Sequence, residues 1–229
     1  MTKPTILIVS TSAARMTSGE PTGIWLEELT TPFYAFLDAG ADVTVASIEG
    51  GEIPVDPRSE ADEAPSARRA RLDKDFQKII ADTPRFDSLT KRFDAVFLPG
   101  GHGVMFDFPG SQALADLVSR QLAEGRVIAA VCHGPAGLVA ARGADGAPVV
   151  QGRKVAGFTN SEEGAVELDT AVPFLLQTRL EELGADYRKG PDFQSFAVRD
   201  GDLITGQNPQ SAGEVARLVL DAVGARQAA

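Results

Sequence analysis

One stretch of the sequence decides the fold class. Residues 127–137 read VIAAVCHGPAG, and five apolar residues run without a polar break into Cys132. A strand without polar alternation is typical of a parallel sheet that helices cover on both faces. Small residues stand two positions before the cysteine (Ala130) and two after it (Gly134), which is the pattern of a nucleophile elbow. The stretch therefore predicts a buried strand that ends in an exposed, reactive thiol, followed by a helix to about Ala141.

The position of Cys132 also predicts its chemistry. Ligands of open α/β sheets bind outside the carboxyl ends of the strands, and this cysteine stands at such an end. We expect the helix N-terminus behind it to lower the pKa of the thiol and to stabilise the thiolate.

Outward from this stretch, short β-branched runs alternate with helical patterns. Strands are predicted at Thr5–Ser10, Val43–Ser47, Asp94–Leu98, Val127–Val131, Pro148–Val150, Lys154–Phe158, Ser195–Val198 and Leu203–Thr205. Helices are predicted at about Gly23–Ala39, Arg71–Ala81, Ser111–Glu124, Glu162–Glu167, Pro173–Leu183 and Ser211–Val223. This alternation predicts an α/β fold, doubly wound, with a mostly parallel sheet and helices on both faces. We expect a single domain over residues 1–229, with a surface insertion at about 58–92.

Composition excludes several classes of protein. Thirty-two acidic and 22 basic residues give a net charge of −10, which disfavours nucleic acid or an anionic membrane as a partner. One cysteine excludes an intrachain disulfide, and two histidines leave little material for a structural zinc site, so no metal is expected. No apolar run approaches the roughly 20 residues of a membrane span, and the start of the chain does not read as a secretory signal. These features predict a soluble, cytoplasmic protein.

A glycine-rich turn follows the strand at 94–98. It reads Pro99-Gly100-Gly101-His102-Gly103 and matches neither a Walker loop nor a dinucleotide fingerprint. In a parallel sheet this turn lies at the same edge as Cys132. A backbone N–H of the turn, together with that of His133, is therefore expected to form an oxyanion hole. The role of His102 stays open.

Two adjacent carboxylates, Glu27 and Glu28, interrupt the apolar side of the helix predicted at 23–39. Neighbouring helical residues point about 100° apart, so one can face solvent while the other faces the sheet edge. The residue pattern alone does not choose between them.

The motifs together resemble the ThiJ/PfpI superfamily, whose fold is that of class I glutamine amidotransferases (a flavodoxin-like fold). The segments that carry the resemblance are Thr22-Gly23 with Glu28 and Pro32, Gly50-Gly51, Asp56-Pro57, Gly100–Gly103 with Asp107 and Pro109, Ala130–Pro135, Gly157–Asn160 with Glu162-Glu163, and Thr205–Ser211. Within the superfamily they are most similar to the glutathione-independent glyoxalase III branch, which is heat-shock-protein-31-like.

This resemblance implies roles for individual residues. Cys132 matches the nucleophile, and Glu28 matches the carboxylate that sits against it. His133 matches the histidine after the cysteine, and Glu163 its acidic partner, with the adjoining Glu162 as the alternative. The backbone N–H groups of Gly101 and His133 match the oxyanion donors.

The function implied by the resemblance is that of a glyoxalase III-type lyase of the D-lactate dehydratase class. The expected substrate is methylglyoxal or a similar small 2-oxoaldehyde, and the product a 2-hydroxy acid. Cys132 would form a hemithioacetal and Glu28 would move a proton between the two carbons, with its pKa raised by the neighbouring cysteine. No cofactor is expected, because the redox change is internal to the substrate. The branch also implies a stress response and a possible homodimer.

Two other functions remain open. A cysteine-dependent amidase or peptidase would use the same thiol and oxyanion hole, but with His133 as the group that activates the nucleophile. A stress chaperone or oxidant sensor would instead oxidise Cys132 reversibly.

Overall fold

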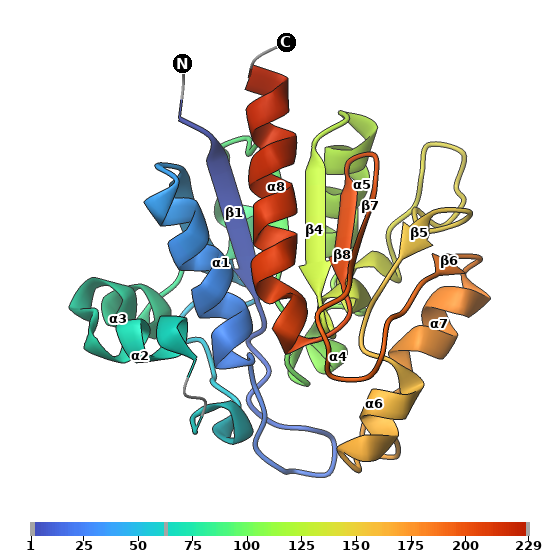
Figure 1. Ribbon diagram of the computed structural model, residues 1–229, viewed down its shortest axis with the longest axis horizontal. Coiled ribbons are helices and arrows are strands. Elements are labelled where there is room, and N and C mark those ends of the chain that lie inside the picture. Colours follow the sequence, from blue (N-terminus) through green and yellow to red (C-terminus); the bar gives the residue numbers. More distant parts are fainter. Residues whose placement is uncertain (1–2, 62–63, 228–229) are drawn as a thin grey trace.

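Six strands form the central sheet, in the order β2-β1-β3-β4-β8-β7. The structure is a computed structural model that describes residues 3–61 and 64–227 (Figure 1). The strands are β1 (Thr5–Ser10), β2 (Asp42–Ser47), β3 (Ala95–Leu98), β4 (Val127–Val131), β7 (Ala197–Asp200) and β8 (Leu203–Gly206). Neighbouring strands run parallel except β7 and β8, which are antiparallel. The predicted, mostly parallel α/β sheet is confirmed.

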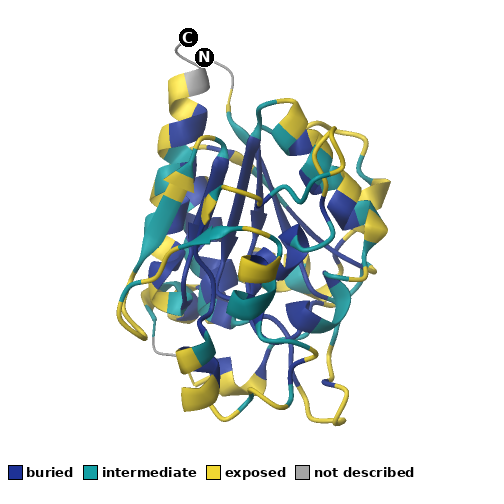
Figure 2. Ribbon diagram, turned by 90° about the vertical axis from the view of Figure 1, so that its right-hand side faces the viewer, coloured by how far each residue is buried: buried dark blue, intermediate teal, exposed yellow. Residues whose placement is uncertain are grey.

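Helices cover both faces of this sheet. The helix α1 (Leu26–Asp38) packs against α8 (Ala212–Gln227) over one face, and α5 (Gln112–Ala123) lies on the other (Figure 1). Every residue of β3 and β4 is buried between these layers, as Figure 2 shows in dark blue along the sheet. This explains why the residues of β4 show no polar alternation.

The segment expected as a surface insertion forms two helices. The helix α2 (Pro65–Leu72) was not predicted, and α3 (Lys74–Ala81) begins after Asp73, whose carboxylate caps its first turn. Phe76 of α3 packs edge-on against Phe33 of α1, with ring centroids 5.0 Å apart. These helices, followed by the short 3₁₀ helix η2 (Phe86–Ser88), connect β2 to β3. That the whole chain forms one domain stays a prediction.

The region after Cys132 departs from several predictions. The expected helix to Ala141 is the 3₁₀ helix η3 (Gly134–Leu138), which is short because two glycines and a proline within it disfavour a longer α-helix. No strand forms at 148–150: Pro148 makes an isolated bridge with Arg142, and the next two residues lie in a turn. The strand expected at 154–158 is only β5 (Lys154–Val155), which pairs with β6 (Asp186–Tyr187) in a second, two-stranded sheet.

The two helices of this region are shifted relative to the prediction. The helix α6 (Asn160–Ala165) begins two residues earlier than expected, because Thr159 caps it. The helix α7 (Leu176–Glu182) begins after Leu175, which is extended, so Pro173 lies outside the helix and not in its first turn.

The carboxyl ends of the parallel strands meet at one edge of the sheet. Thr11 follows β1, Pro99 follows β3 and Cys132 follows β4 at this edge. The first turn of α1 and the helix α4 (Val104–Asp107) also begin here. Among the described residues, no helix has the length and apolar character that a membrane span needs.

Candidate active site

Cys132 sits in a strained turn immediately after β4. Its φ is 58°, in the left-handed region that residues other than glycine rarely adopt. Its N–H donates to the Gly206 carbonyl at 3.0 Å, and its carbonyl accepts from the Phe158 N–H at 2.8 Å. A Cβ at Gly134 would lie 2.1 Å from the Leu98 carbonyl oxygen, so only glycine fits there. The predicted elbow geometry is therefore present.

Glu28 lies against the thiol. It is the third residue of α1 and fully buried, and its Oε2 accepts a hydrogen bond from the Gly100 N–H at 2.8 Å. Burial raises the pKa of Glu28 to about 8, and the nearby Glu27 adds to this, while hydrogen bonds from Cys132 and Gly100 oppose it. Glu27 is half-exposed and makes no such contact with the thiol. The structure thus brings Glu28, and not Glu27, to Cys132.

The thiol itself behaves differently from the prediction. Burial raises the pKa of Cys132 well above its usual value, and the facing Glu28 raises it further. Backbone N–H groups of Gly101 and His133 bond the sulfur and lower the pKa, but they do not outweigh burial. The prediction of an exposed thiol whose pKa is lowered by a helix N-terminus is therefore wrong. The short 3₁₀ turn supplies little dipole, and Cys132 is only 3% exposed.

The predicted oxyanion donors converge on the cysteine. The N–H groups of Gly101 and His133 both point at the Cys132 sulfur. Gly101 has φ 99°, and a Cβ there would lie 2.4 Å from the backbone nitrogen of Trp25. A glycine is therefore required for the turn to approach both α1 and the sulfur.

A histidine and a carboxylate lie on the other side of the thiol. The Cys132 sulfur is 3.3 Å from Nδ1 of His133, whose Nε2 is 2.7 Å from Oε2 of Glu163. Although burial favours its neutral form, the neighbouring His133 and His102 hold the pKa of Glu163 well below its usual range. The predicted Cys132, His133 and Glu163 are thus connected in one chain of contacts.

Glu162 and Glu163 are clearly separated by the structure. Glu162 is the third residue of α6 and accepts hydrogen bonds from the N–H groups of Thr159 and Phe193 at 3.0 and 2.8 Å. It closes a capping box at the start of this helix and contacts neither histidine. Glu163 alone reaches His133.

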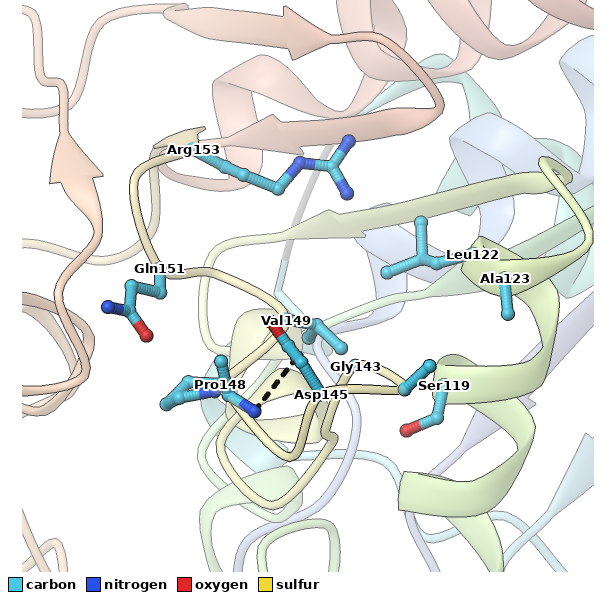
Figure 3. A pocket seen from close by; sticks show the side chains of 11 residues that line it. Ser119, Leu122, Ala123, Gly143, Asp145, Pro148, Val149, Gln151 and Arg153 are labelled. Atoms are coloured by element: carbon cyan, nitrogen blue, oxygen red, sulfur yellow. Dashed lines mark hydrogen bonds between the residues drawn. The ribbon is translucent and has the colours of Figure 1, made fainter.

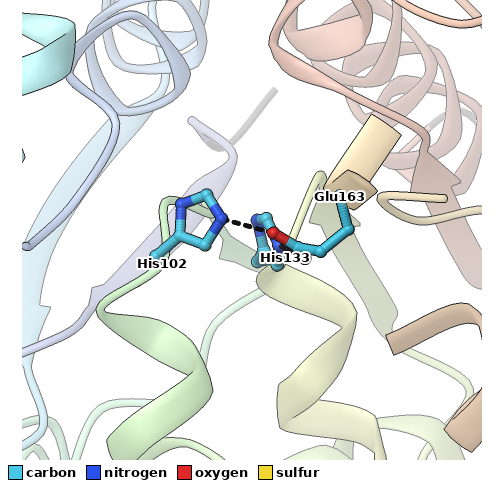
Figure 4. A group of neighbouring side chains, drawn as sticks. All are labelled: His102, His133 and Glu163. Carbon is cyan, nitrogen blue, oxygen red and sulfur yellow. Dashed lines mark hydrogen bonds and ion pairs between the residues drawn. The ribbon is translucent and has the colours of Figure 1, made fainter. Parts of the chain in front are cut away.

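His102 is the group for which the sequence predicted no role. Its Nε2 lies 2.7 Å from Oε1 of Glu163, so one carboxylate serves both histidines of the chain (Figure 4). Burial, followed by the neighbouring His133, lowers the pKa of His102 to about 4. The ring centroids of His102 and His133 are 4.2 Å apart. The available signal was the position of His102 in the turn after β3, at the edge where Cys132 was expected.

These three side chains are also a set that could hold a metal ion. The ligand atoms of His102, His133 and Glu163 lie within 4.8 Å of one another, and two histidines with a glutamate are a familiar zinc set. Here, however, both Nε2 atoms are at hydrogen-bond distance from the same carboxylate, so a metal ion would have to displace these two contacts.

A small cavity opens above the thiol. Its volume is about 110 Å³, and aromatic and aliphatic side chains surround the polar groups at its base. It is lined by Trp25, Gly101, His102, Cys132, His133, Phe158, Val166, Phe193, Pro209 and Gln210. A larger hollow of about 640 Å³ lies between α5 and the loop at 143–153 and is lined mainly by small or flexible side chains (Figure 3). The reactive groups belong to the smaller cavity.

The comparisons with known proteins identify the family of this chain. The DJ-1/PfpI family matches residues 22–222, which include Glu28, Cys132 and Glu163. The chain belongs to the DJ-1/PfpI family. The predicted ThiJ/PfpI relationship is confirmed.

Several relatives cover nearly the whole chain. The glutathione-independent glyoxalase HSP31 of Saccharomyces cerevisiae is 32% identical over 220 residues, which are 90% of this chain and 91% of that relative. The solved structure of glyoxalase III from Candida albicans superimposes with a TM-score of 0.85 at 27% identity, covering 96% of this chain and 97% of that one. The Rapid Encystment Protein 24 KDa of Francisella tularensis superimposes with a TM-score of 0.93 at 37% identity, covering 96% and 99%.

Proposed function

We propose that this protein is a glutathione-independent glyoxalase, a lyase that converts methylglyoxal or a similar 2-oxoaldehyde to a 2-hydroxy acid such as D-lactate. The observation that carries the proposal is the buried Glu28 beside Cys132, with its pKa raised to about 8. Near neutral pH such a group exchanges a proton readily in both directions, as an acid/base catalyst must. Relatives named glyoxalase that match this chain over most of its length support the same function.

The first half of the proposed reaction forms a hemithioacetal. His133 Nδ1 takes the proton of the Cys132 thiol, and the sulfur attacks the aldehyde carbon of the substrate. The N–H groups of Gly101 and His133 stabilise the negative charge that develops on the aldehyde oxygen. Glu28 then gives its proton to this oxygen and becomes a carboxylate.

In the second half of the proposed reaction, the aldehyde carbon is oxidised and the neighbouring carbonyl carbon is reduced. Here C1 is the former aldehyde carbon and C2 is the neighbouring carbonyl carbon. The Glu28 carboxylate removes the hydrogen from C1, which gives an enediol, and then returns this hydrogen to C2. The proton of the C1 hydroxyl passes to the C2 oxygen. The product is a 2-hydroxy thioester on Cys132. Water then attacks this thioester, Glu28 accepts a proton from the water, and the departing sulfur regains its proton from His133. One water is consumed, and no external oxidant or reductant takes part.

The cavity supports a small substrate with an apolar substituent. Its volume of about 110 Å³ leaves room for a compact molecule, and Trp25, Phe158 and Val166 present apolar surface around the reacting carbon. Small reactive aldehydes therefore fit the site better than large or charged compounds.

A glutathione-free assay with methylglyoxal tests this function. The wild type and Cys132→Ala are compared, and both the loss of substrate and the formation of D-lactate are measured. We expect the wild type to form D-lactate and Cys132→Ala to lose turnover. Continued D-lactate formation by Cys132→Ala would exclude the proposed nucleophile.

The location and the oligomeric state of the protein are also part of the proposal. By analogy with the family, we infer a cytoplasmic homodimer that responds to stress. Analytical ultracentrifugation tests the dimer, and a single species with the mass of one chain at micromolar concentration would contradict it.

A further inference from the structure

Glu163 is shared between two histidines through its two separate oxygens. His102 Nε2 meets Oε1 and His133 Nε2 meets Oε2, each at 2.7 Å. Glu163 is 2% exposed and His102 5%, so neither contact is weakened by bulk water. Distances this short are typical of hydrogen bonds to an ionised group.

These contacts determine which ring nitrogen of each histidine carries the hydrogen in the neutral form. Glu163 is ionised, because His133 and His102 outweigh its burial and keep its pKa low. An ionised carboxylate only accepts hydrogen bonds, so each Nε2 must carry a hydrogen. In the neutral form of either imidazole, Nδ1 is then bare. For His133 this bare nitrogen faces the Cys132 sulfur at 3.3 Å, where it can accept the thiol proton.

Among the described residues, the side chain of His102 has no hydrogen-bond partner other than Glu163. Its Nδ1 is buried and has no partner among the described residues. An unsatisfied buried nitrogen destabilises the folded state, and an apolar ring would fill the same space without this penalty. The contact with Glu163 is therefore the feature that only a histidine or a similar donor provides.

We propose that His102 is a positioning residue of the active site: its Nε2–H holds one oxygen of Glu163, so that the other oxygen keeps His133 oriented with a bare Nδ1 toward Cys132. The inference rests on the proposed function for its catalytic consequence. The structural part of the proposal, that two histidines hold the Glu163 carboxylate, does not depend on which reaction is catalysed.

Substitutions at position 102 test the Nε2–H hydrogen bond of His102 separately from the packing of its ring. His102→Phe keeps a ring and loses the donor. His102→Asn and His102→Gln differ by one methylene, and only the glutamine is long enough to place an N–H where Nε2 lies. We expect His102→Phe and His102→Asn to lower kcat about ten- to a hundredfold with little change in KM, the effect of one hydrogen bond to a charged group. His102→Gln should restore kcat to within a few-fold of the wild type.

Nitrogen-15 NMR of the imidazoles gives a readout that does not depend on turnover. The chain has only two histidines, so the spectra of the variants at position 102 report on His133 alone. We expect Nε2–H signals for both rings in the wild type and for His133 in His102→Gln, and a mixture of tautomers for His133 in His102→Phe and His102→Asn. Glu167→Gln is the matched control, because this glutamate just after α6 is exposed, and the imidazole signals of the variant should match the wild type.

The outcomes are distinct. A His133 tautomer that stays unchanged in both His102→Phe and His102→Asn, with kcat within twofold of the wild type, would overturn the proposal. One equivalent of zinc in the purified wild type, lost in His102→Phe, would overturn it too, since His102 would then be a metal ligand. If His102→Phe does not fold, the comparison of His102→Asn with His102→Gln decides whether the hydrogen bond matters. If the wild type has no glyoxalase activity but the tautomers change as expected, the proposed function fails and the positioning role stands.

Discussion

Two hollows lie at opposite ends of β4, and the smaller one has the properties of an active site. The hollow of about 640 Å³ lies near the start of this strand, and of its titratable side chains Asp145 is exposed and Arg153 half-buried. The cavity of about 110 Å³ lies at the carboxyl end and contains Cys132, His102 and His133. Buried groups with shifted pKa values surround it. Volume alone is thus a poor guide, whereas ionisable groups that the fold removes from water mark the site.

The largest expected effect comes from removing the proton carrier. Glu28→Gln keeps the shape of the side chain but cannot take up the C1 hydrogen, so we expect kcat with methylglyoxal to fall about 10²–10⁴-fold. Glu27→Gln, its neighbour on α1, should stay within about threefold. Equal losses in the two variants would show that position 28 has no special role. Activity that survives Glu28→Gln but disappears in His133→Ala, measured on an amide substrate, would favour a hydrolase.

The raised pKa of Glu28 also predicts how stability depends on pH. The folded protein holds this carboxyl protonated up to about pH 8, whereas the unfolded chain releases the proton near the usual pKa of 4.5. The unfolded state therefore binds fewer protons in this range, and the free energy of unfolding falls as pH rises from about 5 to 8. The loss attributable to Glu28 is on the order of 3–5 kcal/mol.

Chemical denaturation of the wild type and Glu28→Gln at several pH values measures this contribution. The difference between the two proteins should change steadily from pH 5 to pH 8, with the wild type losing stability relative to the variant. A difference that is constant over this range would contradict the raised pKa.

A charge at the mouth of the cavity should have a smaller effect. Val166 lines the small cavity and is 39% exposed, so Val166→Asp can place a carboxylate beside the apolar substituent of the substrate. We expect KM for methylglyoxal to rise about tenfold, with kcat changed less, because the cost is that of placing a charge against apolar surface. Val149→Asp introduces the same charge in the larger hollow and should leave KM unchanged.

The smallest expected effect concerns the large hollow itself. Ala123 is exposed at the end of α5 and lines this hollow, so Ala123→Trp should partly fill it without disturbing the core. Steady-state kinetics should stay within about twofold of the wild type. A change of tenfold or more would mean that the hollow takes part in the reaction and that the two regions are not independent.

The sequence predicted the features that depend on local pattern. The apolar run of β4 and the small residues around Cys132 were sufficient for the elbow, because strand burial and turn sterics act within a few residues. The choice of Glu28 over Glu27 required the family resemblance, since both fit the same amphipathic helix. The start of α7 was misplaced, because Pro173 is compatible with both a first helical turn and a loop.

The features that depend on tertiary packing were not predictable in this way. His102 and Glu163 are 61 positions apart, and no periodic pattern connects them. The pKa of Cys132 was expected to fall, because the dipole of a following helix can be inferred from sequence, whereas complete burial against Glu28 cannot. Direct contact and desolvation arise only when distant segments come together.

The most direct test of the central claim follows the single thiol during the reaction. The wild type is treated with iodoacetamide in the presence and absence of methylglyoxal, and intact mass spectrometry measures the rate at which its only cysteine is alkylated. If Cys132 forms the covalent adduct, saturating methylglyoxal should slow alkylation at least about tenfold, and the protection should end when the substrate is consumed. Alkylation at an unchanged rate while D-lactate accumulates would contradict the account.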